Sequence, residues 1–180
     1  MTFDQFITKF TGVFVDTDLA YGAQCMDLVH KYCQDVLGLS DLSILAAPAA
    51  YQVYTGFRWP QYFDKIANTP NGVPQKGDIL IYGTGMGAWG HICIFVSGDV
   101  WNITSFDQNY PLGSSPHLQR HDYRYILGWL HPKQAPTTPS VPSSTCSDYM
   151  KQIKTITYGT NTTANKLEQI KGILKSAGYV

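Results

Sequence analysis

The chain has 180 residues, of which 44% are hydrophobic and 13% aromatic, and its 13 basic and 13 acidic residues give a formal net charge of zero. This length and composition are sufficient for one domain with a sizeable core and a short appendage. The balanced charge, without a run of Lys or Arg, excludes a typical nucleic-acid binder. No apolar run reaches the length that insertion into a membrane requires.

The first part of the chain shows the spacing of helices. A short helix is predicted over residues 3–10, where aromatic and aliphatic residues recur at helical intervals after the capping residue Thr2. A second helix is predicted from Cys25 to about residue 37, with Gly38 as its C-terminal stop. Another helix is expected over 48–54.

From residue 71 the pattern changes to short, β-prone apolar runs between turn signals. Such runs predict strands over 79–82, 91–96 and 125–130. A turn at Gly98-Asp99 leads into a further strand that ends within 105–109, and the polar stretch 111–124 is predicted to be a loop.

Beyond residue 132 the composition shifts. Residues 133–145 are rich in Pro, Ser and Thr, which is typical of a linker. Residues 146–180 resemble one or two amphipathic helices and are too few for a stable core of their own. The main domain is therefore expected over 1–132. The appendage could dock on that domain, self-associate or be poorly ordered.

The four cysteines do not form a C-x-x-C pair. Cys25 and Cys33 would lie about 12 Å apart on one helix, whereas a disulfide needs Cα atoms within about 7 Å. We therefore expect reduced thiols and synthesis in a reducing cytoplasm. The first residues lack the basic start and apolar core of a signal peptide.

Cys25 stands where a polar, Gly-containing loop meets the first turn of the second helix. The free amides and the dipole of a helix N-terminus favour a thiolate, although a lone cysteine is more often a small buried hydrophobe. Downstream, His91 begins a strand, and Asp107 and Asn109 end the next one. A thiol, an imidazole and a group to orient the imidazole are the parts of a cysteine hydrolase.

The hairpin constrains this interpretation. With a strict two-residue turn, His91 would oppose Phe106, and Asp107 would point to the other face of the sheet. One extra residue in the loop, or a bulge, would place His91 opposite Asp107. A catalytic role for Asp107 therefore predicts such an irregularity.

Four blocks together resemble the CHAP domain (cysteine, histidine-dependent amidohydrolase/peptidase) of phage endolysins and bacterial autolysins. They are Gln24-Cys25-x-Asp27-Leu28, Lys76-Gly77-Asp78-Ile79, Gly90-His91-Ile92-x-Ile94-Phe95 and Phe106-Asp107-Gln108-Asn109. The resemblance covers about residues 1–132. It implies a papain-like α+β fold, in which N-terminal helices pack on an antiparallel sheet and a short helical segment follows.

The resemblance also implies the roles of individual residues. Cys25 is the expected nucleophile, and His91 the general base that later acts as acid. Asp107 stands where the family has Glu, Asp or Asn to orient the imidazole, and Asn109 matches an amide that some members keep beside it. The backbone amide of Cys25 is the expected oxyanion donor, worth about 3 kcal/mol.

Three acids precede and enter the second helix. Asp16, Asp18 and Asp27 occupy positions 1, 3 and 12 of a twelve-residue window, the spacing of an EF-hand loop, with the carbonyls of Ala20 and Gly22 at positions 5 and 7. The spacing alone fits a Ca²⁺ site and solvated acids equally well. Resemblance to calcium-binding phage CHAP domains favours Ca²⁺, which would also cancel the carboxylate charge near Cys25.

The remaining histidines receive no role. His30 falls on another face of its helix than Cys25, His117 and His121 are expected to be surface residues of a loop, and His131 has no evident partner.

The resemblance implies a monomeric peptidoglycan hydrolase that acts at the bacterial cell wall. It would cleave amide bonds in the peptide part, as a D,L-endopeptidase or an N-acetylmuramoyl-L-alanine amidase. The alternatives are a cysteine-dependent acyltransferase or other amidohydrolase, and a wall-binding module without catalysis. In this setting, residues 146–180 could also be a truncated wall-binding appendage.

Overall fold

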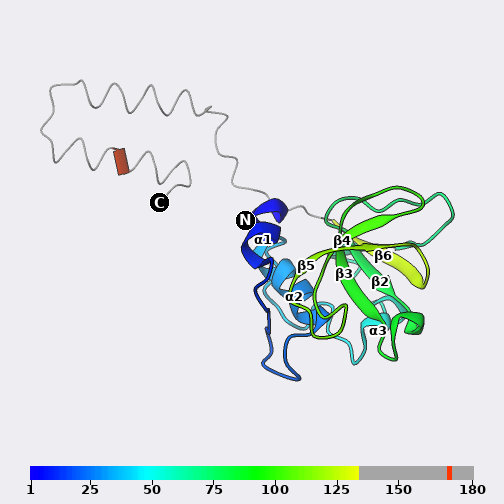
Figure 1. Ribbon diagram of the computed structural model, residues 1–180, viewed down its shortest axis with the longest axis horizontal. Helices are drawn as coiled ribbons and strands as arrows, with labels where there is room; N and C mark the ends of the chain where they lie inside the picture. The colour runs from blue at the N-terminus through cyan, green and yellow to red at the C-terminus, as the bar shows by residue number, and fades with distance from the viewer. Residues whose placement is uncertain (134–169, 172–180) are drawn as a thin grey trace, which may run out of the picture. The chain divides into compact units, whose positions relative to one another are not determined.

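The computed structural model describes residues 1–133 and 170–171 (Figure 1). The chain divides into two compact units, Met1–Pro136 and Thr137–Val180. Of the second unit, only the helical residues 170 and 171 are described, so the predicted linker after residue 133 and the rest of the predicted segment 146–180 lie outside the described residues. No helix among the described residues combines the length and apolar character that crossing a membrane requires.

Within residues 1–133, three α-helices form, and they confirm the three predicted ones. They are α1 (Phe3–Phe10), α2 (Cys25–Asp35) and α3 (Ala50–Thr55). At the start of α1, the Thr2 hydroxyl accepts a hydrogen bond from the Gln5 N–H, and the Gln5 side chain accepts one from the Thr2 N–H. This reciprocal capping satisfies two amides that helix geometry leaves without partners.

In the same described stretch, six strands form one antiparallel sheet in the order β1-β6-β2-β3-β4-β5. They are β1 (Phe63–Ala67), β2 (Ile79–Tyr82), β3 (His91–Gly98), β4 (Ile103–Asp107), β5 (His117–His121) and β6 (Ile126–Pro132). A 3₁₀ turn, η1 (Thr84–Met86), separates β2 from β3. The predicted α+β class with an antiparallel sheet is confirmed.

The sequence did not predict β1 and β5, which are the two edges of the sheet. In β1 only the first residue is buried, and in β5 partly buried and exposed residues alternate. Edge strands of this kind lack the apolar run that marks a buried strand. The predicted loop 111–124 is therefore wrong where β5 lies.

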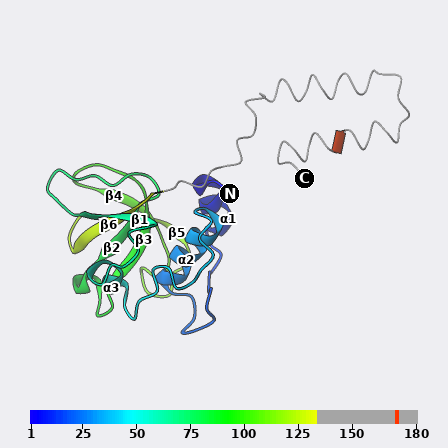
Figure 2. The same cartoon turned by 180° about the vertical axis from the view of Figure 1, so that it is seen from behind.

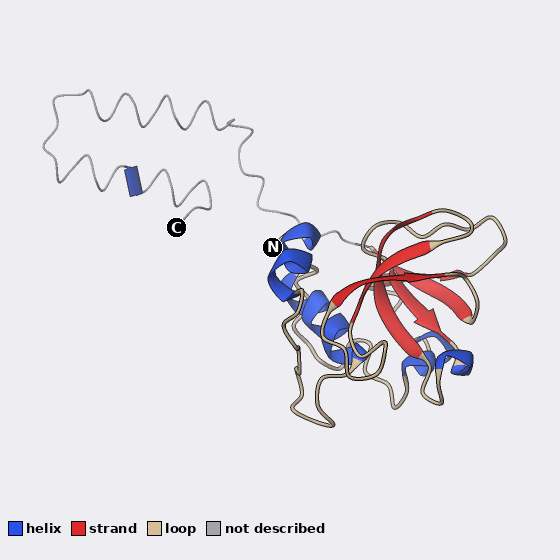
Figure 3. Ribbon diagram, in the orientation of Figure 1, coloured by secondary structure: helices blue, strands red, loops and turns tan. Residues whose placement is uncertain are grey.

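The helices cover one part of the sheet, α2 against β3 and α3 against β2, β3 and β6. In both views, α1 and α2 lie together beside the sheet (Figures 1–3). Phe6 of α1 packs edge-to-face on Tyr32 of α2 and Phe106 of β4, with ring centroids 5.8 and 6.1 Å apart. Because burial of a large apolar side chain stabilises by about 1.5–3 kcal/mol, these rings fix the helices against the sheet.

The Lys76-Gly77-Asp78 block proves to be an anchor between α2, β2 and β6. The Tyr32 hydroxyl donates to the Gly77 carbonyl at 2.9 Å, and a Cβ at Gly77 (φ +94°) would meet that hydroxyl at 2.8 Å. The buried Asp78 carboxylate accepts from the Gln75 N–H and pairs with His131 Nδ1 at 2.6 Å. His131, to which the sequence assigned no partner, therefore has a structural one.

Candidate active site

Cys25 is the first residue of α2 and is half-buried. The preceding residue, Gln24, is extended (φ −97°, ψ 166°), and its N–H donates to Asp27 Oδ2 at 2.8 Å. The other oxygen of Asp27 accepts from the N–H and the hydroxyl of Thr17 at 2.9 and 2.7 Å. Asp27 therefore caps the helix and ties the loop 16–24 to it, which fixes the direction in which the chain delivers Cys25.

Gln108, which follows Asp107 at the end of β4, joins this loop to the sheet. Its side chain is fully buried, and its Oε1 accepts from the Val15 N–H at 2.8 Å. Its Nε2 donates to the carbonyls of Val15 and Gln24, at 2.8 and 2.6 Å. One side chain thus holds both ends of the loop that leads to Cys25. Sequence reasoning gave it no role, although it lies inside the Phe106–Asn109 block.

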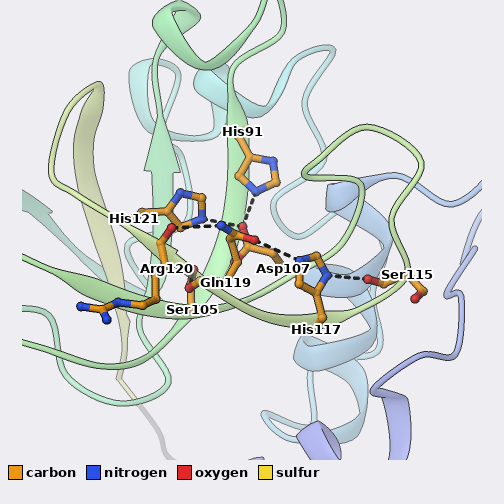
Figure 4. A network of polar contacts seen from close by, with 8 residues as sticks. All are labelled: His91, Ser105, Asp107, Ser115, His117, Gln119, Arg120 and His121. Carbon is orange, nitrogen blue, oxygen red and sulfur yellow. Dashed lines mark hydrogen bonds and ion pairs between the residues drawn. The ribbon is translucent and has the colours of Figure 1, made fainter.

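His91 and Asp107 meet in the interior of the site (Figure 4). His91 Nε2 lies 2.8 Å from Asp107 Oδ2, and the two side chains are only 4% and 0% exposed. Because the carboxylate accepts at Nε2, the neutral imidazole carries its proton there and presents the lone pair of Nδ1. The thiol of Cys25 is among the groups that raise the pKa of the same ring.

The irregularity that the sequence demanded is present, but the register differs from the expectation. A four-residue loop, 99–102, and a bulge between Phe95 and Ser97 separate β3 from β4. Ile94 pairs with Phe106, so the ladder continued by one residue places Asp107 opposite Cys93 rather than His91. His91 and Asp107 still share one face, because they are diagonal neighbours two residues apart in register.

The charge states of this pair support each other. Burial alone would lower the pKa of His91, but hydrogen bonds with Asp107, Cys25 and Cys93 outweigh it and raise the pKa well above 6.5. Burial alone would raise the pKa of Asp107, but hydrogen bonds from His121 and His91 hold it well below its ordinary value. The geometry therefore favours an imidazolium beside a carboxylate.

His121 also contacts Asp107, which corrects the expectation of a surface histidine. It ends β5, its side chain is 5% exposed, and its Nε2 lies 2.9 Å from Asp107 Oδ2, the same oxygen that His91 contacts. His117 lies four residues earlier on β5 and faces Ser115 and Gln119 instead (Figure 4). A loop prediction for 111–124 could not have placed these two rings.

Asn109 contacts the N-cap of α2. Its Nδ2 donates to Gln24 Oε1 at 3.0 Å, and its Oδ1 accepts from the Gly113 N–H at 2.7 Å. Gln24 Nε2 in turn donates to the Tyr21 carbonyl at 2.9 Å. Asn109 adopts φ +62°, a conformation in which Asn is favoured over most residues. In this structure it links the loop that leads to Cys25 to the loop that follows β4.

The three predicted metal-binding carboxylates come together. One oxygen each from Asp16, Asp18 and Asp27 lies within 4.8 Å of the others, a separation that fits oxygens around one Ca²⁺ at 2.3–2.6 Å. Asp16 Oδ1 is buried and has no hydrogen-bond partner within the described residues. Ala20 donates its N–H to Asp18 Oδ1, and Gly22 turns the loop at φ +71°. Three hard oxygen donors with one orphaned atom fit a divalent cation.

A pocket of about 540 Å³ lies beside His121, the β5 histidine that contacts Asp107. His121, Tyr82 and Tyr110 form its inner wall, and Arg120 and Arg124 stand on its rim. Tyr110 packs on both imidazoles, with ring centroids 5.2 Å from His91 and 5.1 Å from His121. The pocket therefore borders the charged centre through His121 and Tyr110.

The family model of the CHAP domain matches residues 15–109, a stretch that contains Cys25, His91 and Asp107. Among solved structures, the fold is similar to that of the endolysin LysIME-EF1, with a TM-score of 0.59 and 24% identity over 73% of this chain and 64% of that one. It is also similar to Ly7917, with a TM-score of 0.53 and 20% identity over 73% and 63%.

The structure of Ly7917 with the hydrolyzing product of MDP aligns with a TM-score of 0.51 and 18% identity over 72% of this chain and 62% of that one. The chain thus spans less than two thirds of the length of each of these structures. At such identities the likeness shows the fold. No curated protein sequence matches the chain.

Proposed function

Since the chain belongs to the CHAP domain family, we propose that it is a thiol-dependent hydrolase that cleaves amide bonds in the peptide part of bacterial peptidoglycan. The observation that carries this proposal is the convergence of Cys25, His91 and Asp107. A thiol at a helix N-terminus helps to raise the pKa of an imidazole whose Nε2 is held by a buried carboxylate.

The mechanism follows from these contacts. His91 accepts the thiol proton at Nδ1, because Nε2 is committed to Asp107. The Cys25 thiolate attacks the carbonyl carbon, and the imidazolium then gives its proton to the leaving amine. The raised pKa of His91 favours the imidazolium that this second transfer needs. Water hydrolyses the thioester, with His91 again as base.

The negative charge that develops on the carbonyl oxygen needs a donor. The N–H of Cys25 is one of the first amides of α2, which have no partner within the helix, and the helix dipole adds to its effect. We assign it to the oxyanion, with a contribution of about 3 kcal/mol.

We further propose that the loop 16–27 binds Ca²⁺ through Asp16, Asp18 and Asp27, with the carbonyls of Ala20 and Gly22 completing the site. The support is the clustering of the three carboxylates and the orphaned oxygen of Asp16. A bound ion would balance the carboxylate charge two residues from Cys25 and stiffen the loop that presents it.

The test is digestion of purified cell walls by the wild type, Cys25→Ala and Cys33→Ala. Cys33 is a buried thiol two turns along the same helix, so its variant controls for loss of a thiol as such. Loss of the nucleophile should lower the rate by roughly 10³-fold or more, whereas Cys33→Ala should keep most of it if it folds.

Mass analysis of the released muropeptides identifies the bond. A free stem peptide indicates the amidase, and cleavage within the stem indicates the endopeptidase. A Cys25→Ala variant that still clears walls would refute the thiol mechanism. Transfer of an acyl group to an added amine without wall cleavage would instead favour the acyltransferase of the same superfamily.

A further inference from the structure

Two histidines from different strands share one carboxylate oxygen. His91 Nε2 of β3 lies 2.8 Å, and His121 Nε2 of β5 lies 2.9 Å, from Asp107 Oδ2 (Figure 4). All three side chains are at most 5% exposed. The other oxygen, Asp107 Oδ1, is buried without a hydrogen-bond partner among the described residues. A nucleophile, a base and an orienting carboxylate do not by themselves require a second imidazole.

We propose that His121 is a positioning residue, which donates its Nε2–H to Asp107 and holds the carboxylate in the orientation that His91 needs. This inference rests on the proposed hydrolase function. The end of an Asp side chain rotates in a broad, shallow torsional well. With Oδ1 unheld, contacts at Oδ2 are what restrain that rotation, and His121 supplies one of the two.

The shared oxygen also has an electrostatic consequence. An acceptor that takes two hydrogen bonds gives less stabilisation to each donor than it would give to one alone. His121 therefore moderates how strongly Asp107 stabilises the imidazolium of His91. Without His121, the same carboxylate would serve His91 alone, and the pKa of His91 would rise further.

The surroundings of the two rings contain other groups that could influence them. Those that face His121 are Asp107 from β4, His91 from β3, the Tyr82 ring from β2, the Tyr110 ring after β4, Asp122 next in the chain, and Arg120 at the pocket rim. His91 additionally faces Cys25 of α2 and Cys93 of its own strand. Among these groups, Asp107 is the one that both imidazoles contact through Nε2.

β5 offers a matched control. His117 is the same residue type on the same strand and the same side, and its register partner is Asp107 itself. Its ring nitrogens, however, contact the Ser115 carbonyl and Gln119 Oε1. Replacement of His117 thus removes a partly buried β5 histidine without removing a hydrogen bond to the carboxylate.

The experiment follows the imidazole NMR signals of His91 against pH in the wild type, His121→Leu, His121→Gln and His117→Leu. The pKa of His91 should rise in His121→Leu and stay near the wild-type value in His121→Gln, whose amide can donate in place of Nε2, and in His117→Leu. This readout needs no turnover, so it tests the inference even if the chain does not hydrolyse walls.

The kinetic arm measures kcat/KM on walls against pH. His121→Leu should lower the rate about tenfold to a hundredfold, the loss expected for one hydrogen bond to a charged group. Its alkaline limb, which reports loss of the imidazolium proton, should move to higher pH, and His121→Gln should recover most of the rate.

An unchanged His91 titration in a folded His121→Leu protein would overturn the proposal, and so would an equal shift in His117→Leu. If His121→Leu does not fold, the NMR titration of the wild-type protein tests the proposal. Titration of one histidine must then perturb the signals of the other, and independent titrations would refute the shared carboxylate.

Discussion

Gln108 joins the N-terminus of α2, where Cys25 lies, to the strand that carries Asp107. Its amide satisfies the Val15 N–H, the Val15 carbonyl and the Gln24 carbonyl, all from one buried position. Buried backbone groups of this kind are costly when they lose their partners. The relative placement of Cys25 and Asp107 therefore depends on a side chain that does no chemistry.

Replacement of Gln108 by Leu keeps the volume and removes all three hydrogen bonds. We expect it to lower the free energy of unfolding by about 3 kcal/mol, since each orphaned buried group costs about 1–3 kcal/mol. Activity on walls should fall as well, because Cys25 loses its fixed distance from His91. Chemical denaturation measures the first effect and wall digestion the second.

Gln119→Leu, on the exposed edge strand, is the control. Equal stability of the two variants would show that Gln108 does not anchor the loop.

The loop 16–24 and the first turn of α2 act as one element. Leu19, Tyr21 and Gly22 all have positive φ, which costs energy for the two non-glycine residues. The Asp27 carboxylate accepts hydrogen bonds from the N–H groups of Thr17 and Gln24, which lie at the two ends of the loop. The strained loop turns the carboxylates of Asp16, Asp18 and Asp27 toward one another, and a cation there would offset their repulsion.

Calcium should therefore stabilise this element measurably. We expect added Ca²⁺ to raise the midpoint of thermal unfolding, by the equivalent of about 2.7 kcal/mol at a hundred times the dissociation constant. A chelator should lower both the midpoint and the rate of wall digestion, and calcium should restore them. Asp16→Ala should abolish the calcium response, whereas Asp41→Ala, at an exposed acid outside the loop, should keep it. If neither the midpoint of thermal unfolding nor the rate of wall digestion changes with calcium or chelator, the metal site is refuted.

For the molecule as a whole, the buried charges link stability to pH. The pKa of Asp107 is lower in the folded than in the unfolded chain. Its contribution to the free energy of unfolding is therefore complete above about pH 4 and is lost as the pH falls further. The pKa of His91 is raised on folding. Its contribution to the free energy of unfolding is therefore complete below about pH 6.5 and is lost as the pH rises through the pKa of the folded state. Both contributions are complete between about pH 4 and 6.5.

The expected measurement is the free energy of unfolding of the wild type and His91→Gln from pH 5 to 9. The difference between them should shrink as the pH rises above about 6.5, by about 1.4 kcal/mol for each unit by which folding raises the pKa of His91. A constant difference between His91→Gln and the wild type would mean that His91 is not stabilised as an imidazolium.

The helices and the central strands could be predicted because capping and periodicity signals within each segment specify them. Thr2 and the recurring Phe residues specify α1, and the apolar runs at 79–82 and 91–96 specify central strands. The helix that begins at Cys25 ends at Asp35, a few residues before the predicted stop at Gly38. The order of the Cys25, His91 and Asp107 blocks also sufficed to recognise the family. Each of these signals lies within a few residues of the chain, where capping and periodicity act.

The contacts that complete the site join residues far apart in sequence. Gln108 reaches Val15 across 93 positions, and His121 reaches Asp107 only because a polar edge strand pairs there in a particular register. The bulge at Phe95–Ser97 shifts the register by one residue and so places Asp107 on the same face of the sheet as His91, diagonal to it. The sequence by itself thus determined the helices, the central strands and the three chemical groups. Only the tertiary structure decided which carboxylate oxygen each imidazole meets, because register and edge pairing depend on packing across the whole sheet.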